Sequence, residues 1–191
     1  MNASYRALDN AMSAFAQSAL GGGLPSGVDA LIAEAGRLRE RPEEALTLLQ
    51  LARGVAPNHP VPLIALYRFH FYGHELAQAR AVGEDALAIA RTALGPDFGD
   101  QPLGGAITRY DAAARFYLFT MKGLAYLNMR LGDLEEARMQ LRELRRLDPE
   151  DRVGGALLSQ VLTRHEAGLG IDDEIDALGA YPARGWTGTQ P

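Results

Sequence analysis

Residues 121–149 read MKGLAYLNMRLGDLEEARMQLRELRRLDP, and this stretch predicts two helices joined by a tight turn. Apolar residues recur at intervals of three and four through both halves, which is the spacing of the buried face of a helix. Gly132-Asp133 predicts the turn between the halves, because glycine readily ends a helix. Ala137 lies near the start of the second half, and so small a side chain allows two paired helices to pack closely. The stretch therefore predicts an antiparallel helix pair.

Small residues open the second helix of a predicted pair at three places in the chain, namely Ala45, Ala79 and Ala137. Ala79 follows Ala45 by 34 residues, whereas Ala137 follows Ala79 by 58 residues, an excess of 24. The excess coincides with a stretch rich in glycine and proline, GPDFGDQPLGGAI at 95–107, which predicts a loop. We therefore expect three related helix pairs with an insertion at about residues 94–117.

A 34-residue period of helix pairs is that of the tetratricopeptide repeat, and this chain resembles that family. The third unit carries the resemblance through Met121, Leu124, Ala125, Leu131-Gly132-Asp133-Leu134, Ala137, Leu141, Leu144 and Asp148-Pro149, with Asn128 where the family usually has tyrosine. The first unit shares the spacing through Ile32-Ala33, Ala45, Leu49, Ala52 and Pro57. The second unit departs from the pattern, since Gly83 replaces a large residue and Arg91 replaces the proline.

The resemblance implies an all-α fold in which antiparallel helix pairs stack in a right-handed solenoid over residues 26–151. An N-terminal capping helix with a glycine-rich loop is expected in 1–25, because apolar residues recur helically over 4–20. C-terminal capping helices and a tail are expected in 152–191, with a short helix at 172–179. The alternative is an ordinary helical bundle whose alanine and leucine spacing imitates a repeat.

Capping residues and prolines predict where the helices begin. Ser26 or Asp29 is expected to cap a helix that runs to about residue 40, and Pro42 to open the next one. Thr108 with Asp111 is expected to start a long helix that ends near residue 130. The remaining expected helices run over about 62–72, 75–93, 134–147 and, from an Asp148-Pro149 start, 148–167.

The composition excludes several classes of protein. The chain has 191 residues, of which 47% are apolar and 23% charged, with a net charge of −5, so it can form a sizeable core and is a poor match for nucleic acid. It contains no cysteine, which excludes disulfides, thiolate metal sites and cysteine nucleophiles. Lys122 is the single lysine among 19 basic residues, a bias that indicates a bacterium of high GC content. Without a signal peptide or an apolar run of about 18 residues, we expect a soluble, cytoplasmic protein that does not bind membranes.

In the tetratricopeptide family the first helices of the pairs line a concave groove, which holds a peptide or a helix of a partner. Placing this sequence in register puts toward that groove Glu34, Arg37, Leu38, Val61, Ile64, Arg68, Phe71, Tyr72, Phe119, Lys122, Tyr126, Met129 and Arg130, with Arg164 from the added helix. Aromatic residues, methionine and arginine are the types enriched at binding hot spots. We therefore expect an adaptor, assembly factor or chaperone that binds a protein or peptide.

Within this set we expect partner contacts from Arg37, Arg68, Phe71, Tyr72, Lys122, Tyr126, Met129, Arg130 and Arg164. The rings and Met129 would supply affinity by apolar burial, and Arg68, Lys122 and Arg130 would select an acidic or carboxylate-bearing segment. Some of the rings are expected to belong to the core between repeats instead. A subgroup of the family grips a C-terminal carboxylate with lysine and asparagine, but here Ala30 and Glu34 occupy those places, so that function is not expected.

Two alternative functions are a structural self-association module and a metal-dependent enzyme with His70 and His74 at its site. The helix expected over 4–20 would make the chain a self-association module if it packed against a second copy, giving a homodimer. His70 and His74 are four residues apart, which is a metal-ligand spacing, but no third ligand or general base lies between them. Phosphate-binding glycine loops and nucleophile elbows are absent from the sequence. We therefore expect no enzyme activity, no metal and no cofactor.

Overall fold

The computed structural model describes residues 24–38, 40–105, 107 and 111–168. Within these ranges the chain is all-α and contains no β-strand, as predicted. The helices are α2 (Val28–Arg37), α3 (Pro42–Val55), α4 (Pro60–Tyr72), α5 (Leu76–Leu94), α7 (Ala112–Leu131), α8 (Leu134–Leu147) and α9 (Ala156–Glu166). None of them is long and apolar enough to cross a membrane. The helices expected over 4–20 and 172–179 lie outside the described residues.

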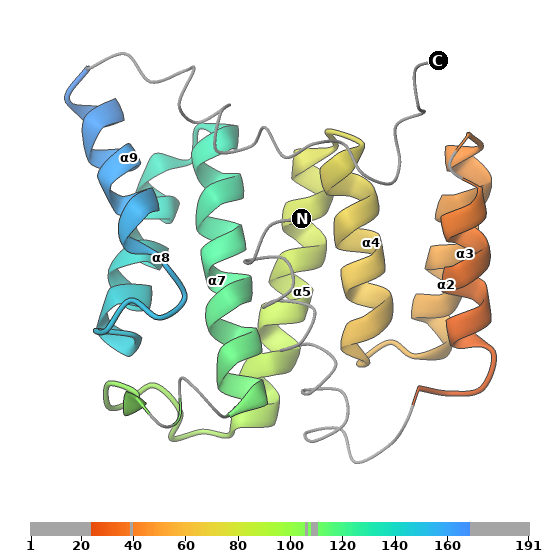
Figure 1. Cartoon of the computed structure of the whole chain (residues 1–191), viewed down its shortest axis with the longest axis horizontal. Helices are drawn as coiled ribbons and strands as arrows, with labels where there is room; N and C mark the ends of the chain where they lie inside the picture. Colours follow the sequence, from red (N-terminus) through yellow and green to blue (C-terminus); the bar gives the residue numbers. More distant parts are fainter. Residues whose placement is uncertain (1–23, 39, 106, 108–110, 169–191) are drawn as a thin grey trace.

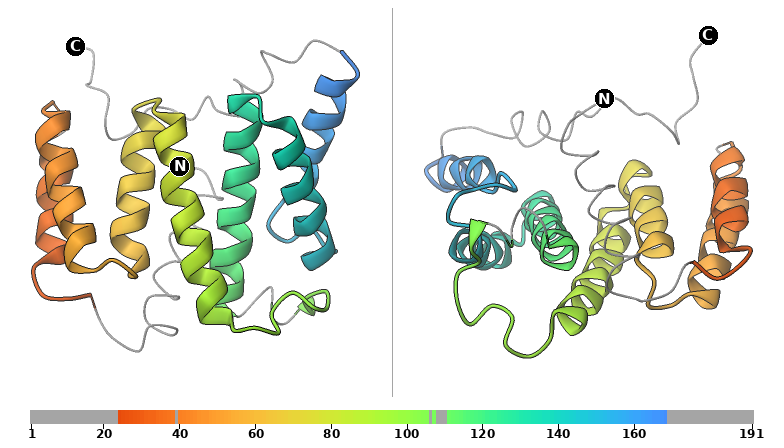
Figure 2. Two further views of the ribbon diagram at one scale, coloured as in Figure 1. Left: turned by 180° about the vertical axis from the view of Figure 1, so that it is seen from behind. Right: turned by 60° about the horizontal axis from the view of Figure 1, so that its bottom comes forward.

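Consecutive helices pack as antiparallel pairs along a row, with α2 against α3, α4 against α5, and α7 against α8 (Figure 1). Seen from behind, α3, α5 and α8 lie in front of their partners (Figure 2). The first helices of the pairs therefore share one layer and the second helices share the other. α5 packs against both α4 and α7, so the second pair is joined to the third despite the loop between them.

The three small residues that define the predicted pairs are all inaccessible to solvent. Ala45, Ala79 and Ala137 each have 0% of their surface exposed. Gly83 brings α5 and α7 together in a similar way, because a Cβ at this position would lie 2.9 Å from Cδ2 of Leu124. The glycine that departs from the repeat pattern thus permits a close approach of two helices.

Several predicted helix boundaries agree with the structure. Pro42 occupies the first position of α3, and α8 spans the predicted residues 134–147. α7 is capped by Asp111, whose Oδ1 accepts a hydrogen bond from the Ala114 N–H at 2.7 Å. α4 begins two residues before the predicted start, because Nδ1 of His59 accepts from the Val61 N–H and caps the helix there.

The predicted start of a helix at Asp148-Pro149 is wrong, since α9 begins only at Ala156. Asp148 is 2% exposed, and its carboxylate accepts a hydrogen bond at 2.9 Å from the Val153 N–H, which closes a loop rather than a helical turn. Asp151 has a φ of 53° and accepts from the Ala156 N–H instead. These side chains compete successfully with a helical backbone.

The predicted cap of the first described helix is also wrong. α2 has Gly27 at its N-cap, with a φ of 88° and no side-chain hydrogen bond, so neither Ser26 nor Asp29 caps it. Glycine adopts this left-handed conformation without steric cost, which allows the chain to enter the helix directly from the preceding turn.

The described part of the insertion is held against the ends of α7 and α8. The Leu103 N–H donates to the Leu147 carbonyl at 3.0 Å, and the Arg146 guanidinium donates to the Gly99 carbonyl at 2.5 Å. The Phe98 and Tyr117 rings meet edge to face with centroids 5.0 Å apart. Because α7 and α8 are antiparallel, these contacts lie at the end of the molecule opposite to the C-terminus of α7 (Figure 1).

Candidate partner-binding surface

Four aromatic rings from α4 and α7 form a continuous cluster on the layer of first helices. This aromatic cluster consists of Tyr67, Phe71, Tyr72 and Tyr126. Phe71 lies at its centre, with centroid distances of 5.8 Å to Tyr67, 5.5 Å to Tyr72 and 6.1 Å to Tyr126. The Tyr67 and Phe71 rings are stacked with planes 11° apart, whereas Tyr72 meets Phe71 at 81°. The cluster therefore links two helices that are 40 or more residues apart in sequence.

Tyr67 is a member of the cluster that the sequence register did not place in the groove. It occupies a position at which the repeat expects a small residue, and it reaches α7 because Gly123 leaves room for it. A Cβ at Gly123 would lie only 3.2 Å from the Tyr67 hydroxyl. The pairing of a large residue in one first helix with a glycine in the next was a signal present in the sequence.

Exposure divides the aromatic cluster into an outer and an inner part. Tyr67, Phe71 and Tyr72 are half-buried, whereas Tyr126 is 9% exposed. Met129 is 4% exposed and belongs to the hydrophobic core formed by α7, α8 and α9. Met129 therefore supports the surface from beneath, and the expectation that it faces a partner is not met. Ile64, also expected toward the groove, is likewise buried at 6% exposure.

Arg130 borders the cluster at the last turn of α7. Its guanidinium donates to the Tyr126 hydroxyl at 2.9 Å and lies 5.9 Å from the centroid of that ring. Contact with the ring face adds a cation–π attraction and restrains the guanidinium. A positive charge is thus held against Tyr126, the inner ring of the aromatic cluster.

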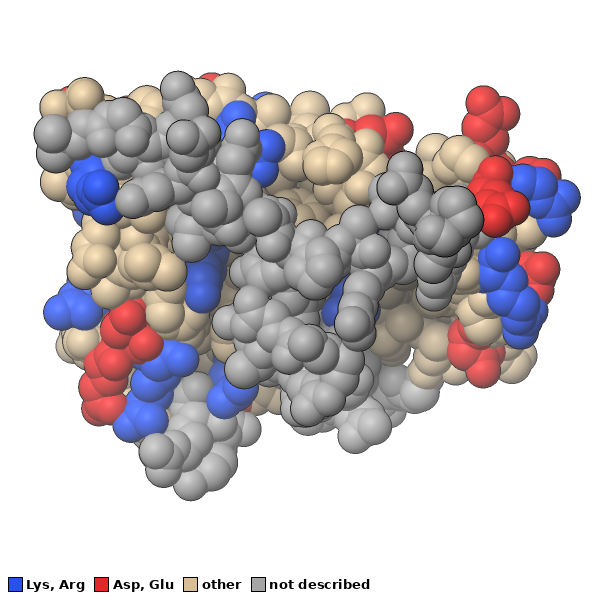
Figure 3. Space-filling model, turned by 45° about the horizontal axis from the view of Figure 1, so that its top comes forward, with Lys and Arg blue, Asp and Glu red and all other residues tan. Residues whose placement is uncertain are grey.

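The charges of α4 and α7 are all positive. These two helices contain Arg68, Arg115, Lys122 and Arg130 and no aspartate or glutamate, in a chain whose net charge is −5. Where the space-filling view leaves described atoms visible, blue basic side chains are spread over the face and red acidic ones appear mainly at its left and right margins (Figure 3). This face is therefore electrostatically suited to an acidic ligand.

Lys122 takes part in the fold rather than offering its charge to a partner. Its ammonium donates to the Val153 carbonyl at 2.7 Å and so ties α7 to the connection between α8 and α9. Burial lowers the pKa of Lys122, and the negative charge of Asp151 partly opposes that shift. The expectation that Lys122 selects a partner segment is therefore corrected to a structural role.

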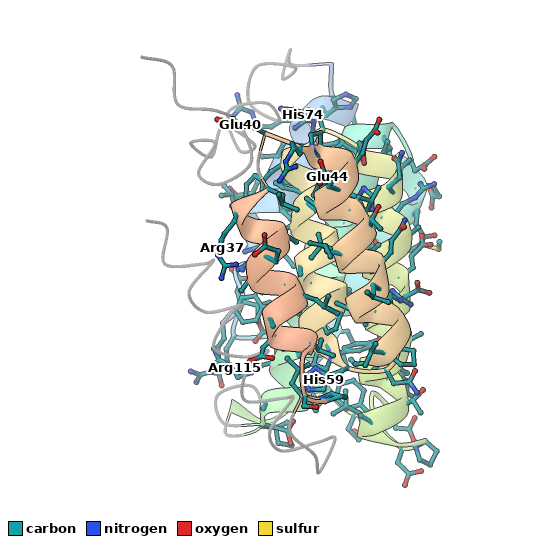
Figure 4. The ribbon with its side chains drawn as sticks, turned by 90° about the vertical axis from the view of Figure 1, so that its right-hand side faces the viewer. Arg37, Glu40, Glu44, His59, His74 and Arg115 are labelled. Carbon is teal, nitrogen blue, oxygen red and sulfur yellow. The ribbon has the colours of Figure 1, made fainter. Side chains whose placement is uncertain are left out.

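The remaining predicted residues lie farther along the row. Arg37 is exposed on α2 and forms an ion pair with Glu34, one turn earlier in the same helix. Its side chain projects to the same side of the molecule as that of Arg115 (Figure 4). Arg164 is exposed in the last turn of α9. The structure thus groups the predicted residues of α4 and α7, and it leaves Arg37 and Arg164 on the outer helices.

The two histidines at metal-ligand spacing are separated by the end of α4. Nδ1 of His70 lies 2.5 Å from the Glu75 carboxylate, whereas His74 is exposed and has a φ of 60°. In Figure 4, His74 lies at the same end of the molecule as Glu40 and Glu44. Among the described residues there is no group of three or more side chains able to hold a metal ion.

Comparison with known proteins finds a sequence relative and no match to a family model or a solved structure. A curated relative from Azotobacter chroococcum mcd 1, the "Uncharacterized 19.8 kDa protein in nifW 5'region", is 32% identical over 121 residues, which is 61% of this chain and 68% of the relative. This chain belongs to the family of that Azotobacter protein. The similarity to the Azotobacter protein extends over 121 residues, so it covers much of the helical row and not a single helix pair.

Proposed function

We propose that this chain is a tetratricopeptide-like helical repeat protein that binds a peptide or helix of another protein on the face of α4 and α7. The row of antiparallel pairs and the buried alanines at their second helices support a right-handed solenoid of the repeat type. The Azotobacter relative agrees with a bacterial source. In this role the protein is an adaptor, an assembly factor or a chaperone, and it uses neither a catalytic residue nor a cofactor.

The aromatic cluster bordered by Arg130 is the observation that carries this proposal. Partly exposed rings supply apolar area at a small cost in conformational entropy, because each ring has few rotatable bonds. A cation at the edge of such a patch selects for a carboxylate while the rings bury apolar side chains. A partner segment with apolar residues on one side and acidic residues beside them fits this combination.

The contributing residues differ in what they offer. Phe71 and Tyr72 would bury apolar side chains of the partner, Tyr126 and Met129 would hold the surface rigid from below, and Arg68 with Arg130 would favour its carboxylates. Arg37 and Arg164 would act only on a segment long enough to reach the outer helices. A short peptide would therefore depend on α4 and α7, and a long helix on all of these residues.

The experiment is capture of partners from native cell extract by the full chain and by two variants. Tyr72→Ala with Arg130→Ala is expected to abolish capture of the protein that co-purifies with the native chain, without changing the circular dichroism spectrum. The matched control is Met139→Ala with Arg142→Ala, which removes one exposed apolar residue and one arginine from α8 in the second-helix layer and should capture normally. Undiminished capture by the Tyr72/Arg130 variant contradicts the assignment of the surface.

Self-association is the second candidate, and an exposed apolar pair favours it. Leu51 and Val55 are one turn apart on α3, and 53% and 49% of their surfaces are exposed. Exposed apolar residues at this spacing form a stripe suited to a second copy. Light scattering of the full chain should then give a dimer that Leu51→Glu with Val55→Glu converts to a monomer; a native monomer excludes this candidate.

A further inference from the structure

The outer side of α3 has an apolar stripe at one end of the row of helix pairs. This α3 stripe consists of Thr47, Leu48, Leu51, Gly54 and Val55. Leu51 and Val55 have 53% and 49% of their surfaces exposed, and Leu48 is half-buried beside them. α2 and α3 form the end of the row that faces the viewer in Figure 4. The end units of helical repeats need polar outer surfaces, because no neighbouring unit covers them, so an apolar stripe at this end indicates a contact.

The predicted 34-residue period relates this side of α3 to a side of α5 that contacts the preceding pair. One period after Leu51 is Asp85, and one period after Leu48 is Val82. Asp85 pairs with Arg53 of α3 at 3.0 Å, and Val82 packs against the core cluster that α2, α3 and α4 share. The α3 stripe therefore lies on the side by which a helix pair contacts its predecessor, and among the described residues no pair precedes the first.

The α3 stripe is uncharged and brings no unsatisfied donor into a contact. Arg53 is the one charged residue within 47–55, and it is turned toward Asp85 of α5. The Thr47 hydroxyl donates to the Glu43 carbonyl at 2.8 Å within its own helix. Near a two-fold axis a charged side chain meets its own copy and is repelled, whereas an uncharged surface is not. The α3 stripe is therefore compatible with a second copy of this chain.

The order of side chains along the α3 stripe suits an antiparallel pairing with itself. A two-fold axis beside Leu51 would set that residue against its own copy. The same axis would set Leu48 of each chain opposite Gly54 of the other, and Thr47 opposite Val55. Gly54 leaves a recess that a leucine can fill, since nothing lies within 4 Å of a Cβ at that position. The stripe is thus self-complementary, as a two-fold interface requires.

We propose that a second copy of this chain covers the α3 stripe, with the two α3 helices antiparallel about a two-fold axis at Leu51. The inference rests on the self-association candidate of the proposed function and adds the arrangement of the dimer. Because the contact involves α3, the aromatic clusters on α4 and α7 stay free in both copies. The dimer therefore holds two partner segments, or one partner at two points with the gain in avidity that linkage gives. One helix from each copy is a small interface, so the dimer dissociates on dilution.

Disulfide trapping tests this arrangement, because the native chain contains no cysteine and each introduced thiol is unique. Under mild oxidation Leu51→Cys is expected to form a covalent dimer at least about tenfold faster than Met139→Cys, since a bound copy holds the two thiols at a high effective concentration. Met139 on α8 is 50% exposed and is the matched control for chance collisions. Equal rates for the two variants on a non-reducing gel overturn the proposal.

A second pair of thiols tests the direction of the helices. Val55→Cys mixed with Thr47→Cys should form a mixed dimer, identified by mass spectrometry, faster than Val55→Cys alone forms a dimer. In the antiparallel register the two copies of position 55 lie about 12 Å apart along the helix axis, which is too far for a disulfide. Circular dichroism verifies the folding of each variant. A Val55→Cys dimer that forms as fast as the mixed dimer overturns the antiparallel arrangement.

The reactivity of the thiol distinguishes a second copy from a cover within the chain. If Leu51→Cys forms no dimer and also reacts slowly with a small maleimide, another part of the same chain covers the α3 stripe, and the proposal is overturned. Rapid reaction with the maleimide in dilute solution, together with fast trapping in concentrated solution, supports the second copy.

Light scattering and partner capture separate this inference from the proposed function. If Leu51→Glu with Val55→Glu dissociates a native dimer, but Leu51→Cys is trapped no faster than Met139→Cys, self-association stands and the arrangement on α3 fails. If trapping succeeds as expected but partner capture is indifferent to Tyr72 and Arg130, the dimer stands and the proposed partner binding fails.

Discussion

At the scale of single residues, glycines in helices have opposite effects on stability according to what surrounds them. Gly83 lies on α5, where a Cβ would meet Leu124 of α7 at 2.9 Å, whereas nothing lies within 4 Å of a Cβ at Gly54 of α3. Alanine is the better helix former at both positions. Only at Gly83 does the added methyl group oppose this gain, because the Leu124 side chain, which is 1% exposed, must move within a packed core.

This contrast predicts that Gly83→Ala lowers the free energy of unfolding by about 1–3 kcal/mol, while Gly54→Ala raises it by roughly 0.5–1 kcal/mol. Urea denaturation of the two variants beside the native chain measures both changes. Two stabilised variants would mean that the Leu124 side chain moves aside without cost and would contradict the tight packing described at Gly83.

His59 predicts a dependence of stability on pH. Its Nδ1 accepts from the Val61 N–H at 3.3 Å, its Nε2 is buried without a hydrogen-bond partner in the described part of the chain, and burial lowers its pKa below 6.5. Because the unfolded chain then binds a proton more readily than the folded chain, this contribution to stability is complete above pH 6.5 and is lost as the pH falls below it.

Unfolding free energies of the native chain and of His59→Asn, compared at pH 7.5 and 5.5, isolate this effect. Asparagine keeps an acceptor at the cap but does not titrate, so the variant should lose less stability than the native chain between the two pH values. The other three histidines are present in both chains and cancel in the comparison. If the native chain and His59→Asn lose equal amounts of unfolding free energy between pH 7.5 and 5.5, His59 is not the cause of the pH dependence.

At the scale of helices, the sequence predicted most of the elements and failed where side chains replace backbone hydrogen bonds. The boundaries of α3 and α8 could be predicted from Pro42, from the Gly132-Asp133 turn and from the spacing of apolar residues, because these signals depend only on neighbouring residues in the sequence. The start of α9 could not be predicted, because Asp148 bonds to Val153 and Asp151 to Ala156 in a loop specific to this chain. The sequence near Asp148 is compatible with a helix start and with a loop closed by side-chain hydrogen bonds, and the local residues alone do not show which of the two forms.

For the candidate surface, the sequence placed the expected residues on helices that the structure contains, but it did not predict the depth of each side chain. Phe71 and Tyr72 are half-buried on the expected face, whereas Met129 is in the core and Lys122 bonds to Val153. Both differences involve α9 and the loop before it: Val153 of the loop bonds to Lys122, and Met129 packs in the core that α7 shares with α8 and α9. The path of this loop could not be predicted, so neither could the burial of these two side chains.

Asn128 joins three helices through a buried polar network. The side chain is 1% exposed, its carbonyl oxygen accepts from Arg80 of α5 at 3.3 Å, and its amide donates to Gln140 of α8 at 3.0 Å. Asn128→Ala should lower the free energy of unfolding by about 1–3 kcal/mol, because Arg80 and Gln140 lose a buried partner.

Chemical denaturation measures this loss, with Gln78→Ala on the exposed side of α5 as the control expected to change stability by less than about 0.5 kcal/mol. Similar values for Asn128→Ala and Gln78→Ala would show that the network contributes nothing to the connection between α5, α7 and α8.

At the scale of the whole molecule, the row of helix pairs is not equally coupled along its length. α5 packs between α4 and α7, whereas the α2–α3 pair adjoins the described helices mainly through α3 on α4. In structures built from neighbouring units, local opening begins where the contacts between units are fewest.

Hydrogen exchange followed by mass spectrometry should therefore show faster exchange for peptides from α2 and α3 than for peptides from α5 and α7. Arg53 of α3 pairs with Asp85 of α5 at 3.0 Å, and Asp85→Ala should widen the difference by weakening that link. Uniform exchange across the row would indicate a single cooperative unit instead.

The meeting of Gly83 with Leu124 also bears on how such chains diverge. The space that a side chain at position 83 of α5 would occupy is taken by Leu124 of α7. Positions 83 and 124 are therefore expected to co-vary among related proteins. A relative with a bulky residue at position 83 should have a smaller residue than leucine at position 124.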